Sequence, residues 1–285
     1  MKFIFMNQYR SEFRIQKMAD VLGVTRSAYY AWMKRGKSRR SKENDRLINR
    51  IRALHTRSHE IYGSRRITAA LRSEGQSCGK NRVARLMQKE SIVSRMRRKF
   101  RITTHSKHSF PKAANLVRQN FHTEKPDRLW VSDITYIWTK EGWLYLAVIL
   151  DVFSRYVVGW SLSNRLHHSI VLQAFRNAER KRSVQPGLIF HSDQGVQYAC
   201  EDFKEQMRVH QINQSMSGSG NCYDNALAES FFHSLKTEWV YFEKYETKEQ
   251  ASLSIFEYIE SFYNRNRLHS QLGYVSPEKY EQLNA

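Results

Sequence analysis

Three carboxylates stand at positions where the chain could build a metal centre. Asp133 lies inside a predicted strand, Asp193 directly follows another predicted strand, and Glu229 lies on a predicted helix. Neighbouring strands are about 4.8 Å apart, so the two aspartates can converge, and a packed helix can bring Glu229 to the same point. Carboxylates this close repel one another unless a cation compensates their charge. Hard oxygen donors without paired His or Cys residues favour Mg²⁺ or Mn²⁺ over zinc.

Such a centre is suited to phosphodiester chemistry. Two ions about 3.5 to 4 Å apart can stabilise both the entering and the leaving oxygen of an in-line attack. A long chain offers such a triplet by chance, so its helical neighbours matter. Lys236 follows Glu229 by seven residues, within about 20° of the same helical face, and we predict that it holds DNA phosphate. Asn225 precedes Glu229 by four residues on that face, where it either orients substrate or caps the helix.

The elements that must position these residues follow from the apolar patterns. The predicted elements are, in chain order, strands over 129–138, 143–151 and 156–162, a helix over 168–181, a strand over 188–191, a helix over 201–209, a strand near residue 212 and a helix over about 224–240. The first three strands form an antiparallel meander. A right-handed crossover then places the first and fourth strands side by side. Asp151 ends the second strand, and we favour structural hydrogen bonding for it over a role as a fourth acid.

Two helix pairs are predicted before the sheet. In the first pair, a break at Gly23 and a capping Thr25 separate two helices. If this is a helix-turn-helix, its second helix enters the major groove through Arg26, Ser27 and Tyr30. An ordinary helical hairpin explains the pattern almost as well.

The second pair spans 64–74 and 80–90. Five cations lie off its apolar stripe and face solvent or phosphate: Arg65, Arg66, Lys80, Arg82 and Arg85. The stretch from 94 to 118 is basic and has little periodicity, and it is compatible with phosphate contact or with disorder.

The charge of the chain is one-sided. Its 285 residues have a formal net charge of +20, and 30 of the 47 basic residues but only 7 of the 27 acidic residues lie at or before Arg118. Positive charge concentrated in this way favours a polyanion such as nucleic acid. The longest apolar run, 144–150, is far shorter than the ~20 residues of a membrane-spanning helix, and the N-terminus lacks a signal-peptide core. We therefore expect a cytoplasmic protein without a membrane partner.

Four segments resemble the catalytic core of retroviral-integrase-like transposases. They are WVSDITYI, LDVFSRYVVGW, HSDQGVQY and NCYDNALAESFFHSLK, and 35 residues separate Asp193 from Glu229. More narrowly, the chain resembles the downstream-frame protein of bacterial insertion-sequence-three-type elements. RSEFRIQKMADVLGVTRSAYYAW, YGSRRITAAL, NRVARLM and YNRNRLHSQLGYVSPEKY also match that family's pattern, so the resemblance extends over nearly the whole chain.

The resemblance implies an α/β ribonuclease-H-like catalytic core, a mixed five-stranded sheet with helices, preceded by all-α helix-turn-helix DNA-binding units. In that core Asp133, Asp193 and Glu229 would hold two Mg²⁺ ions, for which Mn²⁺ substitutes. Water would cleave the element ends, and the freed 3′-hydroxyl would attack another phosphodiester without a covalent enzyme intermediate. The predicted domains are a helix-turn-helix over 1–40, a second helical unit over 41–100, a basic linker over 101–122, the catalytic core over 123–240 and a helical, basic tail over 241–285.

The expected partners are the terminal inverted repeats of an element and target DNA, bound by a homo-oligomer at the bacterial nucleoid. Family members commonly act as a frameshift fusion with an upstream-frame protein, and Met1 begins without that segment, so such a protein or fusion is a further expected partner. Two alternatives stay open at this point. One is a DNA-binding regulator or accessory protein that is inactive without the upstream-frame partner, and the other is a metal nuclease that does not transfer strands.

Overall fold

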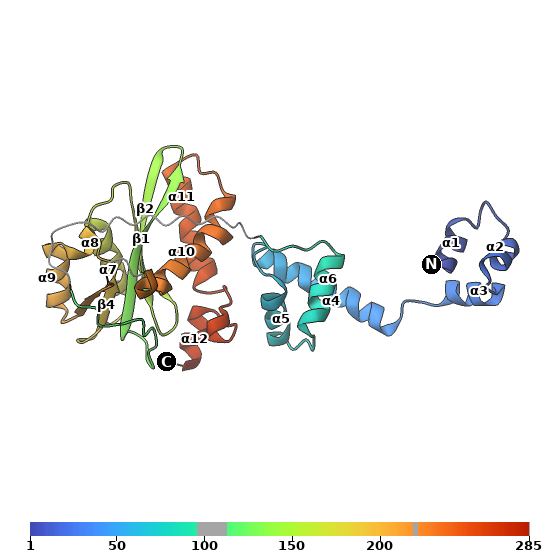
Figure 1. The fold of residues 1–285 in the computed structure, drawn as a ribbon, viewed down its shortest axis with the longest axis horizontal. Coiled ribbons are helices and arrows are strands. Elements are labelled where there is room, and N and C mark those ends of the chain that lie inside the picture. Colours follow the sequence, from blue (N-terminus) through green and yellow to red (C-terminus); the bar gives the residue numbers. More distant parts are fainter. Residues whose placement is uncertain (96–112, 219–221, 285) are drawn as a thin grey trace.

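The computed structural model describes residues 1–95, 113–218 and 222–284. In Figure 1 three short helices lie at one end, a sheet covered by helices lies at the other, and a second helical unit lies between them. The helices before the sheet are α1 (Lys2–Gln8), α2 (Ile15–Leu22), α3 (Arg26–Lys34), α4 (Arg39–Arg57), α5 (Ser64–Ser73) and α6 (Lys80–Lys89). The predicted basic linker falls partly on 96–112, outside the described residues.

The first three helices share a small core built from Met6, Met18, Ala19 and Tyr29. Gly23 ends α2 at a φ of 62°, a left-handed conformation that glycine adopts without strain. Thr25 Oγ1 accepts a hydrogen bond from Ala28 N at 3.2 Å and so caps α3. The predicted turn and cap of this helix pair are therefore confirmed.

The second unit contains one long helix that the sequence analysis does not locate. Helix α4 carries many charged residues, and its buried side chains, which include Leu47, Ile48 and Ile51, form only a narrow stripe. These residues pack with the predicted apolar stripes of α5 and α6. The same core continues into the sheet-containing part of the chain, and this unit is docked on α10 and the C-terminal segment that cover the sheet.

Five strands form one mixed sheet. They are β1 (Leu129–Thr139), β2 (Gly142–Asp151), β3 (Val157–Ser163), β4 (Ile189–Ser192) and β5 (Asn213–Met216). The spatial order is β3-β2-β1-β4-β5; β1 pairs antiparallel with β2 and parallel with β4. The predicted meander and the predicted pairing of the first and fourth strands are both confirmed.

Helices cover both faces of the sheet (Figure 1). The helices of this part are α7 (Ser169–Lys181), α8 (Val196–Ala199), α9 (Glu201–Val209), α10 (Ala226–Glu238), α11 (Lys248–Phe256) and α12 (Pro277–Asn284). Successive strand residues point to opposite faces. Trp130 accordingly packs in the cluster that contains α7, whereas Val131 packs in the cluster that contains α10 and α11. At Gly159 a Cβ would lie 2.3 Å from the Ala174 carbonyl oxygen, so a glycine is needed for α7 to approach β3.

The C-terminal segment returns to the second helical unit. After α11 the chain forms a π-helix over Glu257–Tyr263, and the following residues contact the connection between α4 and α5. There the Tyr62 hydroxyl donates to the Asn266 carbonyl at 2.6 Å and accepts from the Leu268 amide at 2.8 Å. Among the described residues, no helix is both long and apolar enough to cross a membrane.

Candidate active site

Asp133 lies within β1, on the face of the sheet that α10 covers. Its Oδ1 accepts a hydrogen bond from the Ile134 amide at 2.7 Å. Burial raises the pKa of Asp133 well above its ordinary range, and the negative charges of Asp193 and Glu229 raise it further. The positive charge of Lys236 acts in the opposite direction. The other three residues predicted at this centre therefore all act electrostatically on Asp133.

Asp193 directly follows β4, and the parallel pairing of Ser132 with Ser192 places it beside Asp133. Its Oδ1 accepts a hydrogen bond from the Gly195 amide at 2.9 Å, which holds the carboxylate in a tight turn. A Cβ at Gly195 would lie 2.9 Å from the same Oδ1, too close for the present arrangement. The glycine at 195 thus lets the aspartate turn back on its own backbone.

Glu229 and Lys236 both lie on α10, and both side chains are partly exposed. Burial raises the pKa of Glu229. Burial lowers the pKa of Lys236, while the negative charge of Asp133 raises it. In the ranges that the structure describes, no three Asp, Glu, His or Cys side chains are grouped closely enough to hold a metal ion. The aspartates are neighbours in the sheet, and Glu229 is linked to Asp133 by charge.

Asn225 ties the start of α10 to the strand that carries Asp133. It ends a 3-10 helix over Cys222–Asn225, its side chain is buried, and its Nδ2 donates to the Ser132 carbonyl at 3.4 Å. No hydrogen bond from its side chain caps α10, so the capping alternative is not seen. Its Oδ1 is buried without a hydrogen-bond partner among the described residues. Substrate orientation by Asn225 stays a prediction.

Two residues that the sequence analysis did not single out support this edge of the sheet. His191 in β4 is buried, and burial lowers the pKa of its imidazole. One ring nitrogen lies 2.8 Å from Ser215 Oγ, and the other lies 2.7 Å from the Asp224 carbonyl oxygen. Asp224 Oδ2 in turn accepts from the Gly218 amide at 2.8 Å. The signal was present in the HSDQGVQY motif, because a histidine inside an apolar strand needs partners.

Asp151 is a fully buried carboxylate at the end of β2. Its oxygens accept hydrogen bonds from the Asp127 amide at 2.8 Å and from the Phe153 amide at 2.9 Å. Burial raises the pKa of Asp151 to about 7. These bonds confirm the predicted structural hydrogen bonding of Asp151.

The residues predicted to read DNA lie at the start of α3, where Arg26, Ser27 and Tyr30 are exposed. In the second helical unit three of the five predicted cations are exposed: Arg65, Lys80 and Arg85. The other two, Arg66 and Arg82, were expected to face solvent or phosphate, but both are only partly exposed.

Arg66 points inward because the second unit is docked, and its Nη1 lies 3.0 Å from Glu238 Oε1 of α10. Arg82 bonds to Asn44 Oδ1 at 2.7 Å and lies 3.5 Å from Glu43 Oε2 of α4. Both guanidinium groups therefore have acceptors within the chain. Contact of any of the five cations with DNA stays a prediction.

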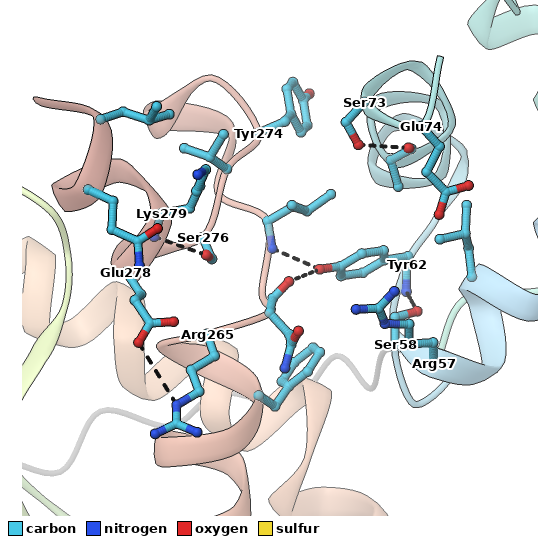
Figure 2. A pocket seen from close by; sticks show the side chains of 18 residues that line it. Arg57, Ser58, Tyr62, Ser73, Glu74, Arg265, Tyr274, Ser276, Glu278 and Lys279 are labelled. Carbon is cyan, nitrogen blue, oxygen red and sulfur yellow. Dashed lines mark hydrogen bonds and ion pairs between the residues drawn. The ribbon is translucent and has the colours of Figure 1, made fainter. Parts of the chain in front are cut away.

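A cavity of about 470 Å³ lies at the junction of the second helical unit and the C-terminal segment. Figure 2 shows Tyr62 between the two parts, with its hydroxyl bonded to the C-terminal segment, and Arg265 beside Glu278 on the opposite wall. None of the predicted catalytic residues lines this cavity. It separates two docked parts and is distinct from the carboxylate site.

Three family models match the chain. An integrase core domain matches residues 123–222, an HTH-like domain matches residues 42–100, and a second integrase core domain matches residues 229–284. Two solved structures are also similar in part. The HTLV-2 integrase catalytic core in complex with magnesium is 18% identical, with a TM-score of 0.41 over 55% of this chain and 97% of that chain. A simian T-cell lymphotropic virus intasome chain is 15% identical, with a TM-score of 0.48 over 80% of this chain and 73% of that chain.

Full-length relatives are found among curated proteins. The chain is 39% identical to the transposase InsF for insertion sequence IS3A of Escherichia coli strain K12, over 100% of this chain and 99% of that protein. It is 41% identical to the insertion element IS600 uncharacterized 31 kDa protein of Shigella sonnei, over 94% of this chain and 100% of that protein.

Proposed function

The chain belongs to the family of IS3 insertion-sequence transposases, and on that premise we propose that Asp133, Asp193 and Glu229 are its catalytic carboxylates. The activity is DNA transposition, and the integrase core makes the protein a polynucleotidyl transferase. The observation that supports these three residues most directly is the effect of neighbouring charges on the pKa of Asp133. Two carboxylates raise the pKa of Asp133 and one lysine lowers it, at an edge where β1 and β4 pair in parallel.

The donor set fits two Mg²⁺ ions, with Mn²⁺ as a substitute. All three side chains offer hard oxygen ligands, and their mutual repulsion is the charge imbalance that a divalent cation removes. When bound, the ions stabilise negative charge on the entering and leaving oxygens. Asp133 and Asp193, which are neighbours in the sheet, would hold the ions together with Glu229 of α10.

The chain's own residues bind and orient the DNA strand. The ammonium group of Lys236, on the same face of α10 as Glu229, holds a phosphate of the reacting strand. Asn225 fixes the start of α10 to β1 and thereby sets the distance between Glu229 and Asp133. Water attacks the phosphodiester at the element end and releases a 3′-hydroxyl, which then attacks a second phosphodiester. Each step exchanges one phosphorus–oxygen bond for another, so no side chain has to serve as nucleophile.

DNA binding outside the core is assigned to the basic helical units. Arg26, Ser27 and Tyr30 are exposed at the start of α3, as a major-groove recognition helix requires. Arg65, Lys80 and Arg85 are exposed cations for the phosphate backbone, while Arg66 and Arg82 contribute less because acceptors within the chain already hold them. A homo-oligomer, with an upstream-frame protein or fusion, would bring two element ends together on the bacterial nucleoid.

The test uses a labelled duplex that carries the element's terminal repeat, incubated with the protein and Mg²⁺ or Mn²⁺. Asp133→Asn, Asp193→Asn and Glu229→Gln should each lower cleavage and joining by at least about a thousandfold, because several kcal/mol of charge stabilisation are lost. Nicked and joined strands are scored on a denaturing gel. Duplex binding should be nearly unchanged.

Asp202→Asn is the matched control, since Asp202 is an exposed acid in the first turn of α9. It should retain the wild-type rates. Cleavage at the wild-type rate by any of the three triad variants, or loss of duplex binding in all of them, would overturn the assignment.

A further inference from the structure

A second charged cavity lies on the other side of α10 from the carboxylates. Its volume is about 280 Å³, and it is lined by residues of α10, α5, the turn between β2 and β3, and the C-terminal segment. At about 100° per residue, Lys236 lies within about 20° of Glu229 around the helix, whereas Ser230 and Ser234, which line the cavity, lie about 100° and 140° away. The cavity is therefore separate from the proposed catalytic face.

Three guanidinium groups line this cavity, those of Arg66, Arg155 and Arg267, and two of them share one carboxylate. Arg267 bonds to Glu238 at 2.6 and 2.7 Å, and Arg66 bonds to the same carboxylate at 3.0 Å. His269, beside Arg267, adds no charge, because burial and the positive charge of Arg267 lower its pKa to about 2. The positive charge of Arg155 is left over after this pairing.

Arg155 has no counter-charge among the described residues. Its side chain makes no ion pair and no hydrogen bond there, although burial lowers the pKa of its guanidinium. Its backbone adopts a φ of 64°, a left-handed conformation that costs energy in any residue with a Cβ. A half-buried unpaired cation and a strained backbone at one position both oppose folding, and such costs are typical of binding sites.

The remaining lining groups suit an oxyanion. Ser230, Ser270 and Gln271 are exposed at the mouth, and their side chains can donate hydrogen bonds. Guanidinium groups bind phosphate through paired N–H donors. Ser230 is the residue after Glu229 in α10, so the mouth opens next to the helix that the proposed chemistry uses.

From these observations we infer that this cavity binds a phosphodiester of the DNA backbone, with Arg155 as its main partner and with hydroxyl groups of Ser230 and Ser270 at its mouth. The inference rests on the proposed function for the identity of the polyanion. It assigns a DNA contact to the catalytic half of a chain whose surplus of basic residues lies before Arg118.

The experiment measures duplex affinity against salt concentration, in EDTA so that no cleavage occurs. Each phosphate contact contributes about 0.9 to the slope of log affinity against log salt. Arg155→Gln should reduce the slope by about that amount and weaken binding about tenfold. Arg155→Lys keeps the charge and should restore most of the slope. Arg180→Gln, which removes an exposed cation of α7 on the opposite face of the sheet, should leave the slope unchanged.

Thermal unfolding without DNA separates a binding role from a structural one. Arg155→Gln should melt no lower than the wild type, because it removes a half-buried charge that has no partner. A lower melting temperature with an unchanged salt slope would overturn the inference and leave Arg155 as a structural residue.

Inorganic phosphate, added at constant ionic strength, distinguishes the source of the anion. If it raises the melting temperature of the wild type but not of Arg155→Gln, and the duplex slope of the two proteins is the same, the ligand is free phosphate and the DNA site is overturned. Failure of the proposed function is distinguishable, since Asp193→Asn should lose cleavage with an unchanged slope, whereas Arg155→Gln changes the slope itself.

Discussion

The two sides of α10 carry opposite and unbalanced charges. One side faces Asp133 and Asp193 and offers Glu229 with a single cation, Lys236. The other side faces three arginines, and Glu238 pairs with two of them, Arg66 and Arg267. One helix thus separates a site short of positive charge from a site short of negative charge.

This contrast gives a way to recognise ligand sites. Removing one member of a buried pair such as Arg267 and Glu238 destabilises the folded chain, because the remaining charge is then buried alone. Charges that stay unpaired, such as Asp133 and Arg155, destabilise the free protein until a ligand of the opposite sign binds. The sign of the effect of a neutralising substitution on stability should therefore differ between paired and unpaired groups.

Neutralising the paired carboxylate should have the largest effect. Glu238→Gln leaves Arg267, whose side chain is 4% exposed, without its counter-charge. The free energy of unfolding should fall by about 3 to 5 kcal/mol, measured by urea denaturation. Glu246→Gln is the control, because its pair with Lys140 is exposed and should be worth less than about 1 kcal/mol. Equal losses of unfolding free energy in Glu238→Gln and Glu246→Gln would contradict the expected difference between a buried and an exposed ion pair.

Asp151 sharpens the comparison, since it is a buried carboxylate held by backbone amides. Its pKa rises from an ordinary value of 3.8 to about 7 in the folded chain. A raised pKa means that the folded state holds the proton more tightly, so stability is lost as pH rises from about 4 through about 7. The loss should reach at most about 4 kcal/mol. Asp151→Asn should flatten this part of the curve of unfolding free energy against pH, and an unchanged curve would refute the attribution.

The smallest effect should come from the unpaired acidic side. Asp133→Asn removes a carboxylate repelled by two others, so without metal the variant should be about 1 kcal/mol more stable than the wild type. Added Mg²⁺ should raise the melting temperature of the wild type more than that of the variant. Asp202→Asn, outside the site, should respond to Mg²⁺ like the wild type. If Asp133→Asn destabilises the metal-free chain, the carboxylate is paired after all.

The acidic side could be predicted from sequence, because strand patterns and a right-handed crossover suffice to place Asp193 beside Asp133. The helical spacing of Glu229 and Lys236 needed only the period of an α-helix. The basic side could not be predicted. Its arginines stand at 66, 155 and 267, and nothing local indicates that they converge.

The orientation of Arg66 shows why the convergence of these arginines could not be predicted from the sequence. Periodicity places it off the apolar stripe of α5, and an exposed cation is the ordinary outcome for such a position. It points inward because the second helical unit docks against α10, and that docking depends on contacts with the C-terminal segment. The spacing of apolar residues predicts which face of a helix is apolar. It does not predict whether another unit will cover the polar face.

The bonds of the Tyr62 hydroxyl have a consequence for how the protein is made. They join residues 204 and 206 positions apart in the chain. At about 5 to 20 residues per second, a ribosome needs ~10 to 40 s between synthesising Tyr62 and synthesising its partners. During that interval the second helical unit lacks the C-terminal part of its dock, and its exposed cations are available to any nearby polyanion. A chain interrupted before Asn266 would still contain Arg66 and Glu238, which pair across the same junction, but it would lack α12 and both bonds of the Tyr62 hydroxyl.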